Sequence, residues 1–121
     1  MSDFYTQNII FHGTKSPNKG EIADPDFVGY EVNTTCGDGI KLFLKVTDDK
    51  ITGAKFNGEG CSISQASASL LVEELRGMSL EEARNLDEKF IHELLGIEVN
   101  PAREKCALLS LKTLRKTLPR I

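Results

Sequence analysis

Three short runs of alternating apolar and polar residues occupy the first half of the chain. They span residues 28–33, 40–46 and 51–56, and the alternation is clearest where Ile40, Leu42 and Leu44 occupy every second position. The pair Asp48-Asp49 between the second and third runs indicates a tight hairpin connection. Strict alternation with one polar face predicts an antiparallel sheet that is covered on one side only.

After residue 60 the apolar positions change to the period of a helix. Ile63, Ala66, Leu70 and Leu71 fall on one face of a helix that ends near residues 76–77. Residues 79–82, with the sequence Ser-Leu-Glu-Glu, form a capping box that begins a second, short helix.

Two further helices are expected before the end of the sequence. The first covers residues 87–95 and is closed by Gly96. The second follows Asn100 as N-cap and Pro101 as first helical residue. Its apolar face is formed by Ala107, Leu111, Leu114 and Leu118.

Strands followed by helices predict an α+β fold, a three-stranded antiparallel sheet with helices packed on one face. No repeat or linker divides residues 1–121, which therefore form a single domain. Residues 2–14 carry only a weak helical pattern, and turn signals follow at residues 16–20 and 24–26. We expect residues 1–26 to form a mobile N-terminal arm.

Composition predicts the cellular compartment and argues against membrane, secreted and disulfide-rich proteins. A chain of 121 residues with 40% hydrophobic and 27% charged residues can bury a core without disulfides. It has no apolar stretch that could cross a membrane and no signal peptide, so we expect a cytoplasmic protein with no membrane partner. Three cysteines, an odd number, argue against a disulfide framework.

Charge is distributed unevenly along the second half of the chain. Residues 73–98 carry a net charge of −5, and residues 101–121 carry +5, within a total of −3. This pattern fits an acidic helical surface beside a basic one, or else a basic docking surface for an acidic partner. Nucleic acid is not expected as a partner, because the basic run lacks interleaved aromatic residues.

Each cysteine falls at the end of a predicted element. Cys36 follows the first strand, Cys61 follows the third, and Cys106 opens the last helix. The ends of the first and third strands of an antiparallel meander lie at the same edge of the sheet. Cys106 joins them there if the last helix packs its N-terminus at that edge, and Asp38 can reach the same point as a fourth ligand.

Three thiolates and one carboxylate suit either zinc or an iron–sulfur cluster. The glycines at 37, 39 and 60 fit such a site, because they permit positive φ and close backbone approach. Spacing alone also leaves room for three independent buried cysteines, since the chain has no C-x-x-C pair. His12 and His92 are expected to be solvated, and Ser62, Ser64, Ser67 and Ser69 to be small packing residues rather than nucleophiles.

Three motifs in this order resemble the family of iron–sulfur cluster assembly scaffolds that includes IscU, SufU and the N-terminal domain of NifU. They are Cys36-Gly37-Asp38, the run from Gly60 to Ser69 (GCSISQASAS), and the run from Arg103 to Leu109 (REKCALL). The resemblance extends from Val28 to Leu118.

The resemblance implies a sheet-and-helix fold like the one predicted above. It also implies that Cys36, Asp38, Cys61 and Cys106 are the ligands of a transient 2Fe-2S cluster or of Zn²⁺. The implied partners are a PLP-dependent cysteine desulfurase, as sulfur donor, and apo iron–sulfur proteins or a downstream scaffold, as recipients. Cys36 and Cys106 are then the candidate persulfide acceptors.

Residue 105 is where the chain departs from the IscU branch. That branch has histidine immediately before the third cysteine and a Leu-Pro-Pro-Val-Lys chaperone motif ahead of it, whereas this chain has Lys105 and the sequence Glu98-Val-Asn-Pro-Ala102. The motifs resemble SufU, but the 45-residue step from Cys61 to Cys106 has no room for the insertion usual in SufU and matches the length of IscU. A protonated lysine cannot bind a metal but stabilises the thiolate of its neighbour, Cys106.

Two hypotheses for the function follow, and a third is less favoured. The first is a non-enzymatic scaffold that receives sulfur and holds a 2Fe-2S cluster for transfer. The second is an enzyme, a zinc-dependent sulfurtransferase that relays persulfide sulfur. A structural zinc domain that only binds partners is the third, and the Asp38 ligand argues against it because closed structural sites favour cysteine and histidine.

Overall fold

The computed structural model describes residues 18–34, 37–96 and 99–118. The helix expected at residues 2–14 lies outside this part of the chain. The elements follow the order expected from the sequence, strands first and helices after. They are β1 (Phe27–Asn33), β2 (Asp38–Thr47), β3 (Lys50–Glu59), α2 (Ser62–Leu75), α3 (Leu80–Arg84), α4 (Glu88–Leu95), the 3₁₀ turn η1 (Pro101–Arg103) and α5 (Glu104–Thr117).

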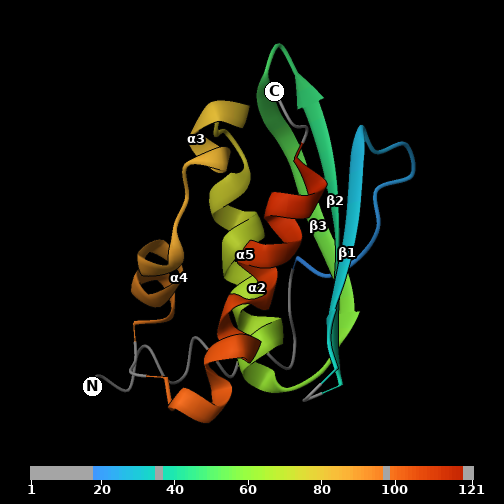
Figure 1. Cartoon of the computed structure of the whole chain (residues 1–121). Coiled ribbons are helices and arrows are strands. Elements are labelled where there is room, and N and C mark those ends of the chain that lie inside the picture. The colour runs from blue at the N-terminus through green and yellow to red at the C-terminus, as the bar shows by residue number, and fades with distance from the viewer. Residues whose placement is uncertain (1–17, 35–36, 97–98, 119–121) are drawn as a thin grey trace.

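The strands form one antiparallel sheet in the order β1-β2-β3 (Figure 1). The hairpin between β2 and β3 turns at the predicted pair, where Asp48 and Asp49 have φ of 51° and 64°. Left-handed backbone at both central residues matches the right-handed twist of the strands it joins, which is why a two-residue loop suffices. The three-stranded antiparallel sheet predicted from the alternation is confirmed.

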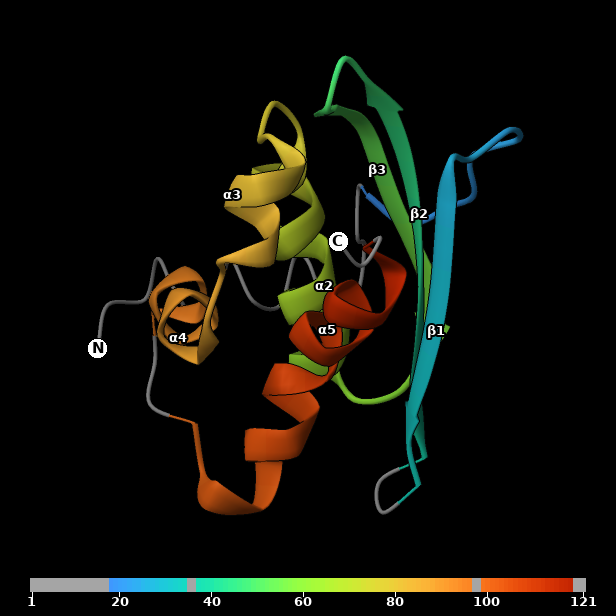
Figure 2. The same ribbon diagram turned by 45° about the horizontal axis from the view of Figure 1, so that its top comes forward.

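The helices cover one face of this sheet (Figure 2). Helix α5 packs on β1 and β2, and α2 packs on β3 and against α5. Helix α4 lies outside them, against α2 and α5. The buried core between sheet and helices includes Ile40, Leu42, Leu44, Phe56, Leu71, Leu75, Leu111 and Leu114. The α+β class and the packing of the helices on one face agree with the prediction, although Phe43, on the other face of β2, is also buried.

The predicted helix caps are observed, but the last α-helix begins at Glu104 rather than at Pro101, because residues 101–103 form a 3₁₀ turn. Ser79 and Glu82 make both hydrogen bonds of the capping box before α3. Gly96 closes α4 in the left-handed conformation, at φ 67°. Asn100 caps the turn η1, which leads into α5. No helix in the described ranges is both long and apolar enough to cross a membrane.

Strand β1 reverses the face that its alternation suggests. Its apolar side chains, Val28, Tyr30 and Val32, are 45%, 52% and 44% exposed and point away from the helices. Gly29 instead faces α5, and a side chain there would overlap the hydroxyl and backbone of Thr117. The close approach of α5 to β1 therefore decides which face of this strand is covered.

Residues 18–26, the described part of the predicted N-terminal arm, run along the sheet. Asn18 and Gly20 exchange backbone hydrogen bonds with Phe56 of β3, and the Asp26 N–H donates to Leu44. The buried Asn18 side chain donates to Ser69 on α2. Residues 1–17 lie outside the part of the chain that the structure describes, and the mobility expected of the arm stays a prediction.

Candidate metal centre

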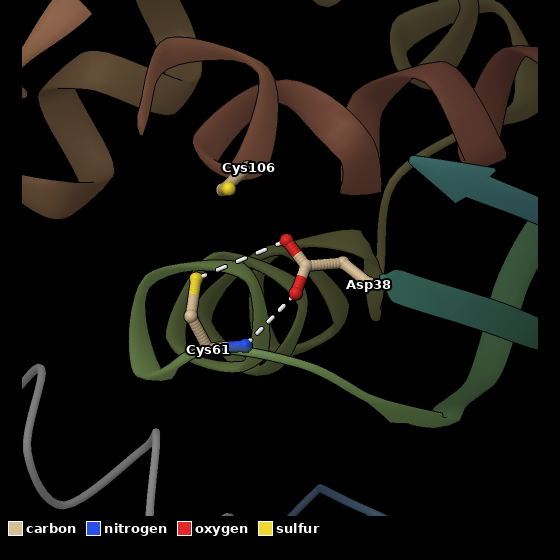
Figure 3. Close-up of side chains that lie close together, drawn as sticks. All are labelled: Asp38, Cys61 and Cys106. Carbon is tan, nitrogen blue, oxygen red and sulfur yellow. Dashed lines mark hydrogen bonds between the residues drawn. The ribbon is translucent and has the colours of Figure 1, made fainter. Parts of the chain in front are cut away.

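Three of the predicted ligands come together from three different elements. Asp38 is the first residue of β2, Cys61 precedes the first residue of α2, and Cys106 lies in the first turn of α5. One carboxylate oxygen and the two sulfur atoms all lie within 4.8 Å of one another (Figure 3). The N-terminus of α5 therefore does pack at the sheet edge where β2 begins and β3 ends.

The two oxygens of Asp38 have different surroundings. Oδ1 accepts the backbone N–H of Cys61 at 2.9 Å, and Oδ2 lies 3.9 Å from the sulfur of Cys61 (Figure 3). Asp38 is 1% exposed, so this backbone bond supplies part of the stabilisation that water gives an exposed carboxylate. Oδ1 is thus held by the backbone, and Oδ2 is the oxygen that can serve as a ligand.

Gly60 is what allows the carboxylate to lie there. Its φ is +147°, and a Cβ on this residue would overlap Oδ1 of Asp38. A larger residue at position 60 would displace the carboxylate even if the backbone kept its path. The contact between Asp38 and Cys61 therefore requires glycine at position 60.

Helix N-termini converge on the same point. Cys61 is the N-cap of α2 and makes no side-chain capping bond, while Cys106 is the third residue of α5. The partial positive charge at the start of each helix attracts anionic groups such as a thiolate or carboxylate. The site therefore collects three potential anions where two helix termini favour negative charge.

The donor set and its spacing fit a small thiophilic ion. Zn–S bonds are about 2.3 Å and Zn–O bonds about 2.0–2.2 Å, so ligand atoms around one tetrahedral zinc lie roughly 3.5–3.8 Å apart. The 3.9 Å from Cys61 Sγ to Asp38 Oδ2 is close to this, and the limit of 4.8 Å for all three atoms exceeds it by about 1 Å. No disulfide joins Cys61 to Cys106.

Cys36 and Lys105 remain outside this geometry for different reasons. Cys36, the fourth predicted ligand and a predicted sulfur acceptor, lies outside the described residues. Lys105 is exposed and lines a groove between β1 and α5, together with Glu104. Its predicted stabilisation of the Cys106 thiolate stays a prediction.

Two contacts near Cys106 were not foreseen. His92, expected to be solvated, is about one-third exposed, and its Nε2 lies 2.7 Å from Oε1 of Glu104, which ties α4 to the first turn of α5. In the sequence, this contact was indicated only by an acidic residue, Glu104, two positions before Cys106. Ser67, expected to be a packing residue, is buried and also donates to the Ala107 carbonyl at 2.7 Å.

Comparison with known proteins shows which family this chain resembles. A family profile described as NifU-like N terminal domain matches residues 4–120. The chain is 38% identical to the zinc-dependent sulfurtransferase SufU of Bacillus subtilis, over 96% of this chain and 90% of that protein. It is 36% identical to the iron–sulfur cluster assembly scaffold protein IscU of Thermotoga maritima, over 97% and 94%.

A solved structure extends the likeness to the fold. The crystal structure of a putative iron–sulfur cluster assembly scaffold protein for the SUF system, from Fervidobacterium islandicum, superposes with a TM-score of 0.80 at 30% identity. It covers 98% of this chain and all of that one. The alignments to the SufU and IscU relatives span 133 positions, more than the 121 residues here, so both contain residues that this chain lacks.

Proposed function

This chain belongs to the NifU-like N-terminal domain family, and on that premise we propose that it is an iron–sulfur cluster assembly scaffold. It accepts sulfur from a PLP-dependent cysteine desulfurase and holds a transient 2Fe-2S cluster for transfer to apo-proteins. The observation that carries the proposal is the meeting of one Asp38 carboxylate oxygen, Cys61 Sγ and Cys106 Sγ within 4.8 Å. Cys36 completes the ligand set in this proposal.

The mixed ligand set gives the scaffold its chemistry. Thiolates are the ordinary ligands of iron–sulfur clusters, and a carboxylate is a harder and weaker partner for the same iron. Asp38 is fixed through Oδ1 and offers a single oxygen. A cluster held partly by one carboxylate oxygen is retained less firmly than one held by four thiolates, as transfer to an acceptor requires.

Anaerobic reconstitution with ferrous iron, L-cysteine, a cysteine desulfurase and a thiol reductant, which reduces the persulfide sulfur to sulfide, tests the proposal. We expect the visible absorption and circular dichroism of a 2Fe-2S cluster, and we expect Asp38→Ala to lengthen the lifetime of that cluster. Cys61→Ala should abolish it, and Ser62→Ala, an exposed change in the next residue, is the control. A protein that stays colourless with active desulfurase would overturn the scaffold proposal.

A second candidate is favoured by the similarity to the Bacillus subtilis protein, whose name is zinc-dependent sulfurtransferase. In this case Cys36, Asp38, Cys61 and Cys106 hold Zn²⁺, which organises the ligands and stabilises their thiolate forms. A thiolate of this chain, Cys36 or Cys106, attacks the outer sulfur of the desulfurase persulfide. A new S–S bond forms, the old one breaks, and the desulfurase cysteine leaves as thiolate.

Metal content and desulfurase turnover separate the two candidates. The sulfurtransferase should purify with about one zinc per chain and should accelerate desulfurase turnover, with the acceleration lost in Cys36→Ala. A cluster formed at full occupancy without any such acceleration favours the scaffold. One equivalent of zinc that iron and sulfide cannot replace favours the sulfurtransferase.

A further inference from the structure

Strand β1 is an edge of the sheet. The order β1-β2-β3 gives it a partner on one side only, and no described residue pairs with its other side. An edge strand presents unpaired N–H and C=O groups that can accept another strand. Natural sheets usually protect such an edge with lysines, proline or a bulge, and the outward positions of β1 are instead the apolar Val28, Tyr30 and Val32.

A groove lies beside this edge, on the helix side of the sheet. It has a volume of about 470 Å³ and lies between the last residues of β1 and helix α5. Leu108 contributes apolar surface, and Lys105, Lys112 and Arg115 are cations along it. Glu88 and Glu104 also line the groove, and Glu104 is engaged by His92.

The cations along α5 exceed the carboxylates available to them. Lys112 and Lys116 share a single acidic partner, Glu31 of β1, at 3.8 and 3.0 Å. The hydrogen bond and charge of Lys116 lower the pKa of Glu31, and burial opposes them. Arg115 and Lys105 form no ion pair with any described residue. This side of α5 is left with positive charge open to a partner.

We propose that the β1 edge accepts an extended segment of a partner protein, in which acidic and apolar residues alternate, as a fourth strand of the sheet. The backbone of the segment pairs with β1. Because side chains alternate across a strand, its acidic residues face the cations of α5, and its apolar residues extend the stripe of Val28, Tyr30 and Val32. This alternation matches the two faces of the sheet beside β1, because the helix side is cationic and the opposite side is apolar.

A second copy of this chain is a poorer occupant of the same edge. Two β1 strands paired about a two-fold axis perpendicular to the sheet would bring both α5 helices to one face, side by side. Their basic sides, with Arg115 and Lys116 on each, would then face each other, and like charges in contact oppose association. A partner that supplies carboxylates has the complementary charge.

Titration of the whole protein with short peptides tests the proposal. The probe is a peptide of alternating valine and glutamate, matched to the seven residues of β1 and followed by nitrogen-15 NMR. We expect amide shifts and slowed amide exchange concentrated in residues 27–33, and binding that weakens several-fold between about 50 and 300 mM NaCl. A peptide of alternating valine and lysine, and the glutamate peptide with a central proline, should bind poorly.

Charge reversal on the protein provides the matched control. Arg115→Glu breaks no observed ion pair among the described residues. It should lower the affinity of the protein for the glutamate peptide by at least about fivefold. Lys55→Glu makes the same charge change at an exposed residue of β3, at the opposite edge, and should leave binding nearly unchanged.

Three results would overturn the proposal. They are no shifts in β1 at millimolar peptide, equal binding of the lysine peptide, and self-association through β1 that the glutamate peptide does not compete with. Because neither the peptide nor Arg115 is part of the metal centre, the outcome is independent of whether the protein holds a cluster or zinc.

Discussion

At the scale of single residues, the candidate metal centre depends on one carboxylate held in one orientation. The N–H of Cys61 fixes Oδ1 of Asp38, and Oδ2 is left beside the sulfur of Cys61. Gly60 leaves the space in which Oδ1 lies. Gly60, which has no side chain, thus helps to determine which oxygen of Asp38 is available to bind a metal.

Gly60→Ala should therefore weaken metal binding without removing a ligand. The added methyl displaces Asp38, and we expect zinc affinity to fall by about 10- to 100-fold, as when a group that orients a ligand is lost. Competition with a chromogenic chelator measures this. Gly77→Ala is the matched control, because Gly77 also has a positive φ, +95°, but nothing within 4 Å of its added methyl. It should lose stability by about 1 kcal/mol or more and keep its zinc affinity, and equal losses of affinity in the two variants would contradict our assignment.

At the scale of elements, the site depends on how α2 and α5 cross. Each helix brings one cysteine at its N-terminus, and small residues let the helices approach. Ser67 of α2 donates to the Ala107 carbonyl and lies 2.7 Å from the hydroxyl of Ser110, and all three residues are buried. This polar contact is one residue from Cys106, so it fixes the helix that carries the second sulfur.

Ser67→Ala should destabilise the fold by about 1–3 kcal/mol, because it leaves Ser110 and a buried carbonyl without this partner. Urea unfolding followed by circular dichroism measures the change. Ser62→Ala, in the exposed first residue of the same helix, should cost far less. The double variant Ser67→Ala/Ser110→Ala should be less destabilised than the sum of the single changes. Full additivity would mean that the two hydroxyls do not act together.

At the scale of the whole molecule, the ligands connect parts of the chain that are distant in sequence. Asp38, Cys61 and Cys106 come from the sheet and from two helices, and the same helices enclose the core. A bound ion would therefore hold together elements whose packing defines the fold. Metal binding and global stability should be linked.

Zinc should raise the unfolding temperature, and a chelator should lower it again. At a free zinc concentration of about 100 to 1,000 times the dissociation constant, the gain is about 2.7–4.1 kcal/mol. Differential scanning calorimetry of the reduced protein, with and without zinc, measures it. Cys61→Ala and Asp38→Ala should reduce the gain, and Lys55→Glu should not. An unfolding temperature that does not respond to zinc would mean that these side chains do not bind it.

The sequence by itself determined the local features of this protein. Alternation predicted the three strands, capping residues predicted the helix ends, and the pair Asp48-Asp49 predicted the hairpin, because each depends on neighbouring residues. The meander also predicted that Cys36 and Cys61 lie at one edge of the sheet, with Asp38 able to reach the same point. The position of Cys106 beside them depended on a condition, the packing of the last helix, that the sequence left open.

Only the tertiary structure decided features that depend on contacts between distant segments. The packing of α5 met the condition on Cys106 and turned the apolar side of β1 outward, because Thr117 approaches where only Gly29 leaves space. It also paired His92 with Glu104 and left the cations of α5 beside a sheet edge. Periodicity shows that a strand has two different faces, but the neighbour that packs against it selects which one is buried.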